Sequence, residues 1–205
     1  RRKRVIIFGV KKSKVSTKLV KEFYSLVKEK ATKKPLNSKV AFENLPKIFP
    51  SRLSSKHSHS VELNAMSLPK NHDPRNHNKR DVEIFKMLTE DIKSGQEKYI
   101  TSKALISLYK EKTGKDSKFH KYHVIREDKP SNTIPAHLYK DGLRHIHPDP
   151  KQSRSITVRE AARIQSFEDD FEFLGSRSDQ YKMIGNAVPP KFSEIIAQTI
   201  LKLKI

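Results

Sequence analysis

The stretch RSITVREAARIQSF, residues 154–167, carries the strongest local folding signal in the chain. Thr157 and Glu160 have the T-x-x-E spacing of a capping box, in which the threonine hydroxyl accepts from the backbone three residues on and the glutamate reaches back to the cap. The spacing predicts a helix that begins at about Val158. A small apolar side, which another backbone can approach closely, is formed by Ala161, Ala162 and Ile164.

The residues that follow predict a turn and another helix. GNAVPP, residues 185–190, is typical of a turn through Gly185 and Asn186. Pro189 and Pro190 suit the first turn of a helix, where a missing backbone N–H costs nothing. One face of that helix carries an apolar stripe, which must cover a core, formed by Phe192, Ile195, Ile196, Ile200 and Leu203.

The start of the chain predicts a buried strand and a basic helix. RRKRVIIFGV passes from cations directly into the unbroken apolar run Val5–Phe8, which is typical of a parallel strand buried on both faces and flanked by neighbours. Residues 13–34 predict a lysine-rich helix that ends before Pro35. Its apolar stripe consists of Leu19, Val20, Phe23, Leu26 and Val27.

The middle of the chain is less regular. Residues 37–80 predict turns and short extended pieces, because prolines interrupt them repeatedly. Two helices are predicted next, one starting at Asp81 and one over 101–114 that is capped at each end. Residues 118–150 look extended and rich in loops, with one strand predicted at Tyr122, Val124 and Ile125.

The composition predicts a polyanionic partner. The formal net charge is +20 and the pI is about 10.0, and each phosphate that a cation neutralises releases bound counterions. A basic surface that only aids solubility is the alternative. Charge alone does not distinguish DNA from RNA or from an anionic membrane face.

Several functional classes are disfavoured by what the sequence lacks. Without cysteine there is no disulfide, no thiolate metal ligand and no cysteine nucleophile. With no apolar run of roughly 18 residues and no signal-peptide pattern, we expect a cytoplasmic protein with no membrane partner. Several histidines could suggest zinc, but their irregular spacing without cysteine predicts no metal: His57, His59, His72, His77, His137, His145 and His147.

Three stretches together resemble a known enzyme family. RRKRVIIFGVKK, RSITVREAARIQSF and YKMIGNAVPP resemble, in this order, motifs VIII, IX and X of the DNA cytosine-5 methyltransferases of bacterial restriction–modification systems. HDPRNHNKRD, DKPSNTIPAH and HIHPD look like parts of their target-recognition region. Family members usually have F-P-D where this chain has Phe167, Glu168 and Asp169, a difference that should loosen the helix exit without abolishing activity.

The resemblance implies a mixed α/β fold, with a small target-recognition domain and part of a Rossmann-like methyltransferase domain that uses S-adenosylmethionine. It assigns 1–36 to the end of the catalytic domain and 37–150 to target recognition. It assigns 151–180 to the motif IX hinge, and 181–205 to the motif X turn and a helix that returns to the catalytic domain.

In this family the target cytosine is flipped out of duplex DNA, because carbon 5 cannot be reached inside the stack. A cysteine thiolate attacks carbon 6, a glutamate protonates the ring and carbon 5 takes the methyl group from S-adenosylmethionine. Both residues belong to motifs that precede motif VIII. The resemblance therefore implies the C-terminal half of such an enzyme, as a fragment or a split subunit, which is inactive without its N-terminal catalytic half.

By the same resemblance, Arg4 hydrogen-bonds the ring oxygen of the flipped cytosine and Arg2 supports that site. The alternative is that both are solvated cations before a strand. Asn186 and Ala187 match the motif X turn beside the methionine end of S-adenosylmethionine, where exposed backbone N–H groups suit a carboxylate. An ordinary turn is the alternative.

Two sets of residues are predicted to meet DNA. Thr133 and Ile134 match the Thr-Ile pair of the recognition region, whose threonine hydroxyl meets the backbone near the flipped base. The polar stretch 72–81 offers groups that pair with phosphates or base edges, with a solvated loop as the alternative: Arg75, Asn76, Asn78 and Arg80.

The motif IX residues Thr157, Arg159, Glu160 and Arg163 are predicted to be structural rather than catalytic. Glu160 caps the helix, and the arginines tie it to the recognition region and the neighbouring domain. The helix then holds the DNA-reading part at a fixed angle to the chemistry. Two other functions stay open, a stand-alone DNA-binding module without catalysis and half of an RNA cytosine methyltransferase.

Overall fold

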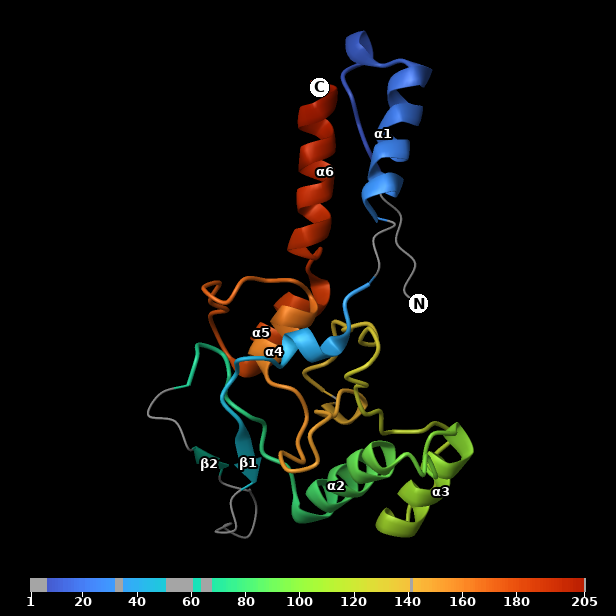
Figure 1. The fold of residues 1–205 in the computed structure, drawn as a ribbon, viewed down its shortest axis with the longest axis vertical. Coiled ribbons are helices and arrows are strands. Elements are labelled where there is room, and N and C mark those ends of the chain that lie inside the picture. The colour runs from blue at the N-terminus through green and yellow to red at the C-terminus, as the bar shows by residue number, and fades with distance from the viewer. Residues whose placement is uncertain (1–6, 32–34, 51–60, 64–67, 141, 205) are drawn as a thin grey trace.

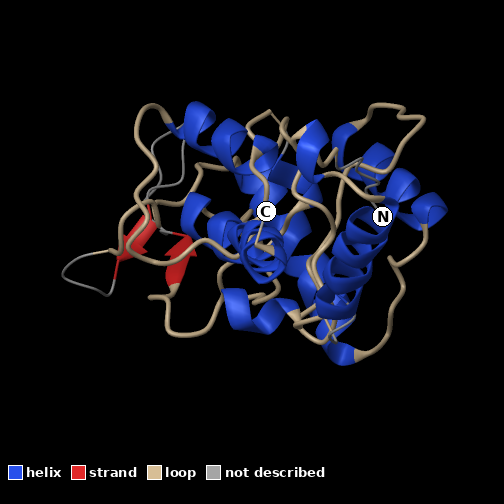
Figure 2. Ribbon diagram, turned by 90° about the horizontal axis from the view of Figure 1, so that it is seen from above, coloured by secondary structure: helices blue, strands red, loops and turns tan. Residues whose placement is uncertain are grey.

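The computed structural model describes residues 7–31, 35–50, 61–63, 68–140 and 142–204. Figure 1 shows a body of helices and loops from which two long helices, α1 and α6, project side by side. The strands lie together at one end of this body (Figure 2).

The elements of the first half begin with the short 3-10 helix η1 (Lys12–Lys14), α1 (Thr17–Ala31) and the 3-10 helix η2 (Ser38–Ala41). The strands β1 (Ile48–Pro50) and β2 (Val61–Leu63) form an antiparallel pair. The helical elements that follow are α2 (Lys79–Ser94), α3 (Ser102–Thr113), η3 (Gly142–Arg144), α4 (Val158–Ile164), α5 (Arg177–Asn186) and α6 (Pro190–Leu203).

Two apolar cores hold the body together. One lies around α4 and α5 and contains Ile134, Ile156, Tyr181 and Ile184, among others. The other lies between α2 and α3, with Phe85 and Tyr122 fully buried. Ile146 joins the two regions, since it forms a parallel bridge to Val124 and an antiparallel bridge to Ser155.

Most predicted helices are present, with the predicted ends. α2 starts behind an Asn78 cap, and α3 lies between a Thr101 cap and a left-handed Gly114. α6 begins at Pro190. Each cap satisfies backbone groups that the helix itself leaves unpaired, which is why these short polar signals locate the ends.

Four predictions differ from the structure. The strand predicted at Tyr122, Val124 and Ile125 is only an isolated bridge at Val124. Gly185 and Asn186 belong to α5 rather than to a free turn, because Ser176 and Asp179 cap a helix there. The basic helix is shorter than 13–34, with η1 and extended residues before Thr17. Ile7 and Phe8 of the predicted strand are not in a strand, and Ile7 is 91% exposed; Val5 and Ile6 lie outside the described residues.

The predicted stripe of α6 is covered only in part. Phe192, Ile195, Ile196, Ile200 and Leu203 are all half-buried, and in the described structure only Thr199 of this helix is fully buried. α6 packs beside α1, where Lys30 Nζ donates to Gln198 Oε1 at 2.7 Å. Leu201 of the same helix is 76% exposed. The described residues supply a single two-stranded sheet, so nothing in them forms a Rossmann-like sheet beneath this helix pair.

Among the described residues, no helix is both long and apolar enough to cross a membrane.

Candidate functional site

α4 begins with the predicted capping box. Thr157 Oγ1 accepts the backbone N–H of Glu160 at 3.2 Å, and Glu160 Oε2 accepts the backbone N–H of Thr157 at 2.7 Å. Both residues are buried, and so is each residue from Val158 to Ala162. α4 is therefore an internal helix, whose polar groups must all be satisfied by the surrounding chain.

The carboxylate of Glu160 also forms a buried, two-point ion pair with Arg154. The guanidinium donates at 2.8 Å and 2.7 Å, and the two side chains are 4% and 1% exposed. Burial alone would raise the pKa of Glu160, but the charge and hydrogen bonds of Arg154 lower that pKa to about 2. Arg154 also donates to Gln152, whose Oε1 accepts the backbone N–H of Ile48. The pair thus connects α4 to β1.

Two buried histidines extend this polar cluster. His147 Nδ1 accepts the backbone N–H of Asp149 at 3.1 Å, so the ring proton is on Nε2, which faces Glu160 Oε1 at 3.6 Å. His72 Nδ1 lies 3.0 Å from Thr157 Oγ1. Burial lowers the pKa of both rings, that of His147 to about 3, so both are neutral at pH 7.

The described residues contain no group of three or more His, Asp or Glu side chains arranged to hold a metal ion. His57 and His59 lie outside the described residues.

Arg159 fastens the other side of α4. It is fully buried, and its guanidinium donates to the backbone carbonyls of Lys70 at 3.0 Å, Glu168 at 3.0 Å and Phe171 at 2.7 Å. Its own N–H donates to the carbonyl of Asn71 at 2.8 Å. Burial lowers the pKa of this guanidinium. All its described partners are main-chain groups, of residues 70–71 and of 168–171, so Arg159 holds these two segments to α4.

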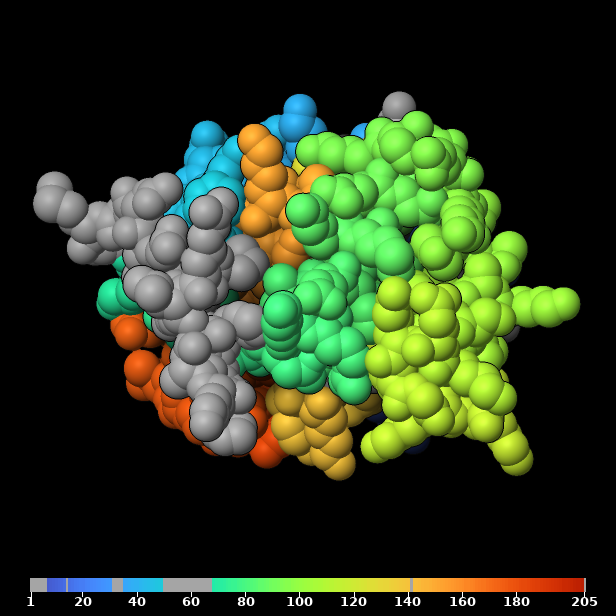
Figure 3. All heavy atoms as spheres, turned by 90° about the horizontal axis from the view of Figure 1, so that it is seen from below, coloured from blue at the N-terminus to red at the C-terminus, as the bar shows by residue number. Residues whose placement is uncertain are grey.

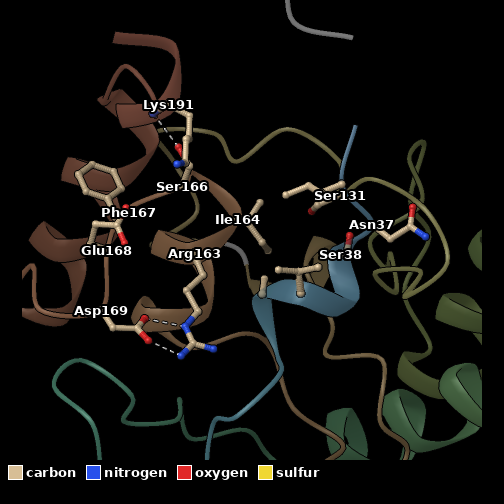
Figure 4. Close-up of a pocket in the computed structure, with 13 residues that line it drawn as sticks. Asn37, Ser38, Ser131, Arg163, Ile164, Ser166, Phe167, Glu168, Asp169 and Lys191 are labelled. Atoms are coloured by element: carbon tan, nitrogen blue, oxygen red, sulfur yellow. Dashed lines mark hydrogen bonds and ion pairs between the residues drawn. The ribbon is translucent and has the colours of Figure 1, made fainter. Parts of the chain in front are cut away.

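Arg163 forms the outer connection of α4, at the edge of a pocket of about 470 Å³ (Figure 4). Its guanidinium donates to both carboxylate oxygens of Asp169, at 2.7 Å and 2.5 Å, and to the carbonyl of Glu43. Asp169 thus anchors the C-terminal end of α4, where this chain has Glu168 in place of the family's usual proline. Figure 4 also shows Ser166 accepting the backbone N–H of Lys191, at 3.1 Å, which joins the exit of α4 to α6.

The backbone of α5 is in close contact with the loop that carries the predicted Thr-Ile pair. A Cβ placed on Gly185 would lie 2.3 Å from the carbonyl oxygen of Pro135, so only glycine fits there. Ile134 is 2% exposed and belongs to the core formed with α5. Thr133 is exposed, and its carbonyl accepts from His145 Nε2 at 3.3 Å. The core residue therefore presents its neighbour Thr133 on the surface.

The four residues predicted in the stretch 72–81 fall into two groups. Arg75 is half-buried, lies 4.0 Å above the ring of Tyr181 and donates to the carbonyls of Leu138 and Tyr139, so its guanidinium is used inside the protein. The other three, Asn76, Asn78 and Arg80, are exposed. Asn78 nevertheless caps α2, and Arg80 pairs with Asp81. Of the four, Arg75 is the least suited to meet a ligand.

The predicted cofactor turn offers fewer donors than the sequence indicated. Asn186 is exposed, but the N–H of Ala187 donates to the carbonyls of Met183 and Ile184. Pro189 and Pro190 have no N–H, and that of Lys191 is taken by Ser166. At this turn, the backbone N–H groups of Ala187 and Lys191 are thus already engaged within the protein. Arg2 and Arg4 lie outside the described residues.

Sequence reasoning missed Arg154 and His72, which complete the buried cluster around Glu160. Arg154 stands directly before the motif helix, but nothing local distinguishes a buried arginine from a solvated one. The signal that could have found it is the acidic side chain of Glu160 beside the small apolar pair Ala161 and Ala162, since a carboxylate buried with them needs a cationic partner.

Comparison with known proteins identifies the family. The family model of the C-5 cytosine-specific DNA methylases matches residues 1–202 of the chain. This chain belongs to that family.

The curated relatives are type II methyltransferases. M.Bpa9945I of Bacillus paralicheniformis is 35% identical over 224 residues, which cover 98% of this chain and 47% of that protein. M1.HphI of Haemophilus parahaemolyticus is 35% identical over 147 residues, 71% of this chain and 35% of that protein. M.AgeI of Thalassovita gelatinovora is 46% identical over 81 residues, 40% of this chain and 18% of that protein. The chain thus spans about half the length, or less, of these relatives.

Proposed function

We propose that this chain is the C-terminal half of a DNA cytosine-5 methyltransferase of a restriction–modification system, which binds duplex DNA and selects the sequence to be methylated. The observation that carries the proposal is the family match over residues 1–202 in a chain that contains no cysteine. Methyl transfer through a thiolate adduct needs a nucleophile, and this chain cannot supply it.

The missing chemistry would come from an N-terminal catalytic half, as a preceding segment or a second subunit. Two observations support this division. M.Bpa9945I is about twice as long as the part that this chain matches. In addition, Leu201 of α6 and Val15, which lies just before α1, are exposed apolar residues that an apolar partner surface would cover.

Recognition would be the task of residues 37–150, with 1–36 and 181–205 belonging to the catalytic domain. The network around α4 supports a hinge at 151–180. Arg159 and Arg163 bind main-chain carbonyls at Lys70 and Glu43, so they fix the predicted recognition domain to the motif helix. A fixed angle between the two parts would keep the flipped base in register with the reacting groups.

S-adenosylmethionine would supply the methyl group in the complete enzyme. From this chain, Asn186 is the exposed side chain at the motif X turn, while the N–H groups of Ala187 and Lys191 are already engaged. This turn can therefore border the cofactor but cannot hold it. Most of the cofactor site would belong to the N-terminal half.

The decisive experiment compares the chain alone with the chain joined to the residues that precede it in its native gene. Both are incubated with tritium-labelled S-adenosylmethionine and either duplex DNA or transfer RNA. We expect label on cytosine of duplex DNA with the joined form alone. Label transferred by the 205 residues alone would contradict the division of labour, and preference for transfer RNA would favour the RNA enzyme. Absence of transfer by both forms would favour a DNA-binding module.

A further inference from the structure

An exposed arginine stands beside Thr133, in a part of the surface to which the sequence assigned no role. Arg144 is the last residue of η3, and its carbonyl accepts the side-chain amide of Asn132 at 3.1 Å. The next residue, His145, donates to the carbonyl of Thr133. Arg144 is thus fixed by its backbone next to the residue that we expect near the flipped base.

The guanidinium of Arg144 is also held in place. His120 Nδ1 lies 3.2 Å from the carbonyl oxygen of Tyr122, an acceptor, so Nδ1 carries the ring proton. Nε2 of His120 is then free to accept, and it lies 3.2 Å from Arg144 Nη2. One nitrogen of the guanidinium is therefore held by His120 Nε2.

Most of the other described arginines, Arg177 excepted, differ in this respect. Arg126 pairs with Glu97 and Asp128, and carboxylates also neutralise Arg80, Arg154 and Arg163. The guanidiniums of Arg75 and Arg159 are used by main-chain carbonyls. No carboxylate of the described residues pairs with Arg144, which is exposed and contacts His120.

A second observation is the composition of the segment before His120, the residue that contacts Arg144. The preceding segment carries Lys115, Lys118 and Phe119, all exposed, and Phe119 is 73% exposed. In Figure 3, the helices α2 and α3, which lead into this segment, form much of the lower face of the molecule. Cations spread along such a surface bind phosphates without regard to sequence, whereas a fixed guanidinium can bind two acceptors at set positions.

We propose that Arg144, oriented by His120 and Asn132, reads a guanine in the recognition sequence through the O6 and N7 acceptors of its major-groove edge. A phosphate contact would need only charge, which a chain of net charge +20 supplies abundantly. The fixed position of this guanidinium is what directional readout requires. The inference rests on the proposed function, because it concerns the recognition surface of that same enzyme.

The test uses the complete enzyme, joined to its N-terminal half, on a library of randomised duplexes. Methylated cytosines are mapped by bisulfite sequencing, and initial rates are measured on the preferred site and on its single-base variants. The variants are Arg144→Lys, which keeps the charge but loses the planar fork, and His120→Ala with its conservative partner His120→Gln. Arg177→Lys is the matched control, since Arg177 is also exposed but lies at the start of α5.

We expect Arg144→Lys to lose discrimination at a single guanine position by about 5- to 150-fold, with the other positions unchanged. His120→Ala should lose part of the same discrimination, His120→Gln should restore some of it by offering an acceptor, and Arg177→Lys should behave as wild type. Unchanged preference in Arg144→Lys overturns the proposal. So does a uniform loss at all sites, with a salt slope reduced by about 1, which indicates a phosphate contact.

The experiment distinguishes failure of the proposed function from failure of the role proposed for Arg144. If the wild-type complete enzyme methylates no duplex, the proposed function fails and the role of Arg144 fails with it. If the wild type methylates a defined sequence and Arg144→Lys methylates the same sequence with the same selectivity, only the role of Arg144 fails.

Discussion

The segment around α4 and the α1–α6 pair are both helical, but they differ in how completely the described chain covers their side chains. α4 is a short helix in which the side chains of Arg159 and Glu160 are buried and bonded, as is that of Arg154 just before the helix. α6 is twice as long, and its apolar residues are only half covered. The first region is complete within the described chain, whereas the second has a face suited to further packing. Four predictions test this contrast.

The largest effect is expected from Glu160→Ala. Removing the carboxylate leaves Arg154 buried without its partner and deletes half of the capping box, and breaking a buried pair costs about 3–5 kcal/mol of unfolding free energy. Urea denaturation at pH 7, followed by circular dichroism, measures the loss. Glu83→Ala, an exposed glutamate on α2, is the control and should change the free energy by less than about 0.5 kcal/mol. Equal stability of the two variants would contradict the buried-network reading.

Mildly acidic pH should lower the unfolding free energy, because the fold buries neutral histidines. The folded-state pKa is lowered from 6.5 to about 3 for His147 and about 4 for His145, mainly by burial, so the unfolded chain binds more protons below about pH 6.5. Stability therefore falls as the pH falls from 7, by about 2 kcal/mol for each ring at pH 5. Urea titrations at several pH values measure it. His147→Asn should flatten the dependence and exposed His137→Asn should not; a flat profile in the wild type would contradict the burial.

Gly185→Ala should destabilise the contact between α5 and the Thr133 loop. Alanine favours a helix by about 1 kcal/mol over glycine, but its Cβ would meet Pro135 O at 2.3 Å, and overpacking of this kind costs about 1–3 kcal/mol. We expect the clash to prevail and the melting temperature to fall. Gly9→Ala, where no atom lies within 4 Å of the added Cβ, serves as control. A rise in melting temperature for Gly185→Ala would show that the loop can move aside.

The smallest effect on folding is expected from Leu201→Ser. Its side chain is 76% exposed, so the unfolding free energy of the chain alone should change by no more than about 0.5 kcal/mol. If the N-terminal half covers this face, retention of that half in a pull-down should nevertheless decrease. Lys202→Ser, the exposed neighbour on α6, should leave both measurements unchanged. A clear loss of stability in Leu201→Ser would show that the face is already packed.

The sequence predicted those helix ends that depend only on neighbouring residues. The capping box of α4, the caps of α3 and the proline start of α6 follow from side chains within a few residues of each helix end. α5 was missed because its apolar residues, chiefly Tyr181 and Ile184, are too few to form a visible stripe, although its Ser176 cap was present.

The candidate site was less predictable for a physical reason. Arg159 and Arg163 were expected to tie α4 to the recognition region, and they bind the carbonyls of Lys70 and Glu43, in the segment that was predicted to be that region. However, the internal use of Arg75 and the exposure of Arg144 depend on contacts between segments about 100 and 24 residues apart, Arg75 with Tyr181 and Arg144 with His120. The local sequence preferences of arginine are the same whether its guanidinium is bound inside the protein or exposed. Only the tertiary structure therefore distinguishes the two cases.

The contact between Gly185 and Pro135 limits how recognition sequences can be exchanged between relatives. Because two backbones meet there without an intervening side chain, their spacing cannot be adjusted by choosing a different rotamer. If residues 37–150 are the recognition segment, as proposed, a graft that replaces part of it must keep the backbone path at Pro135 and glycine at position 185. Segments exchanged within these two limits would keep the position of the Pro135 loop relative to α5.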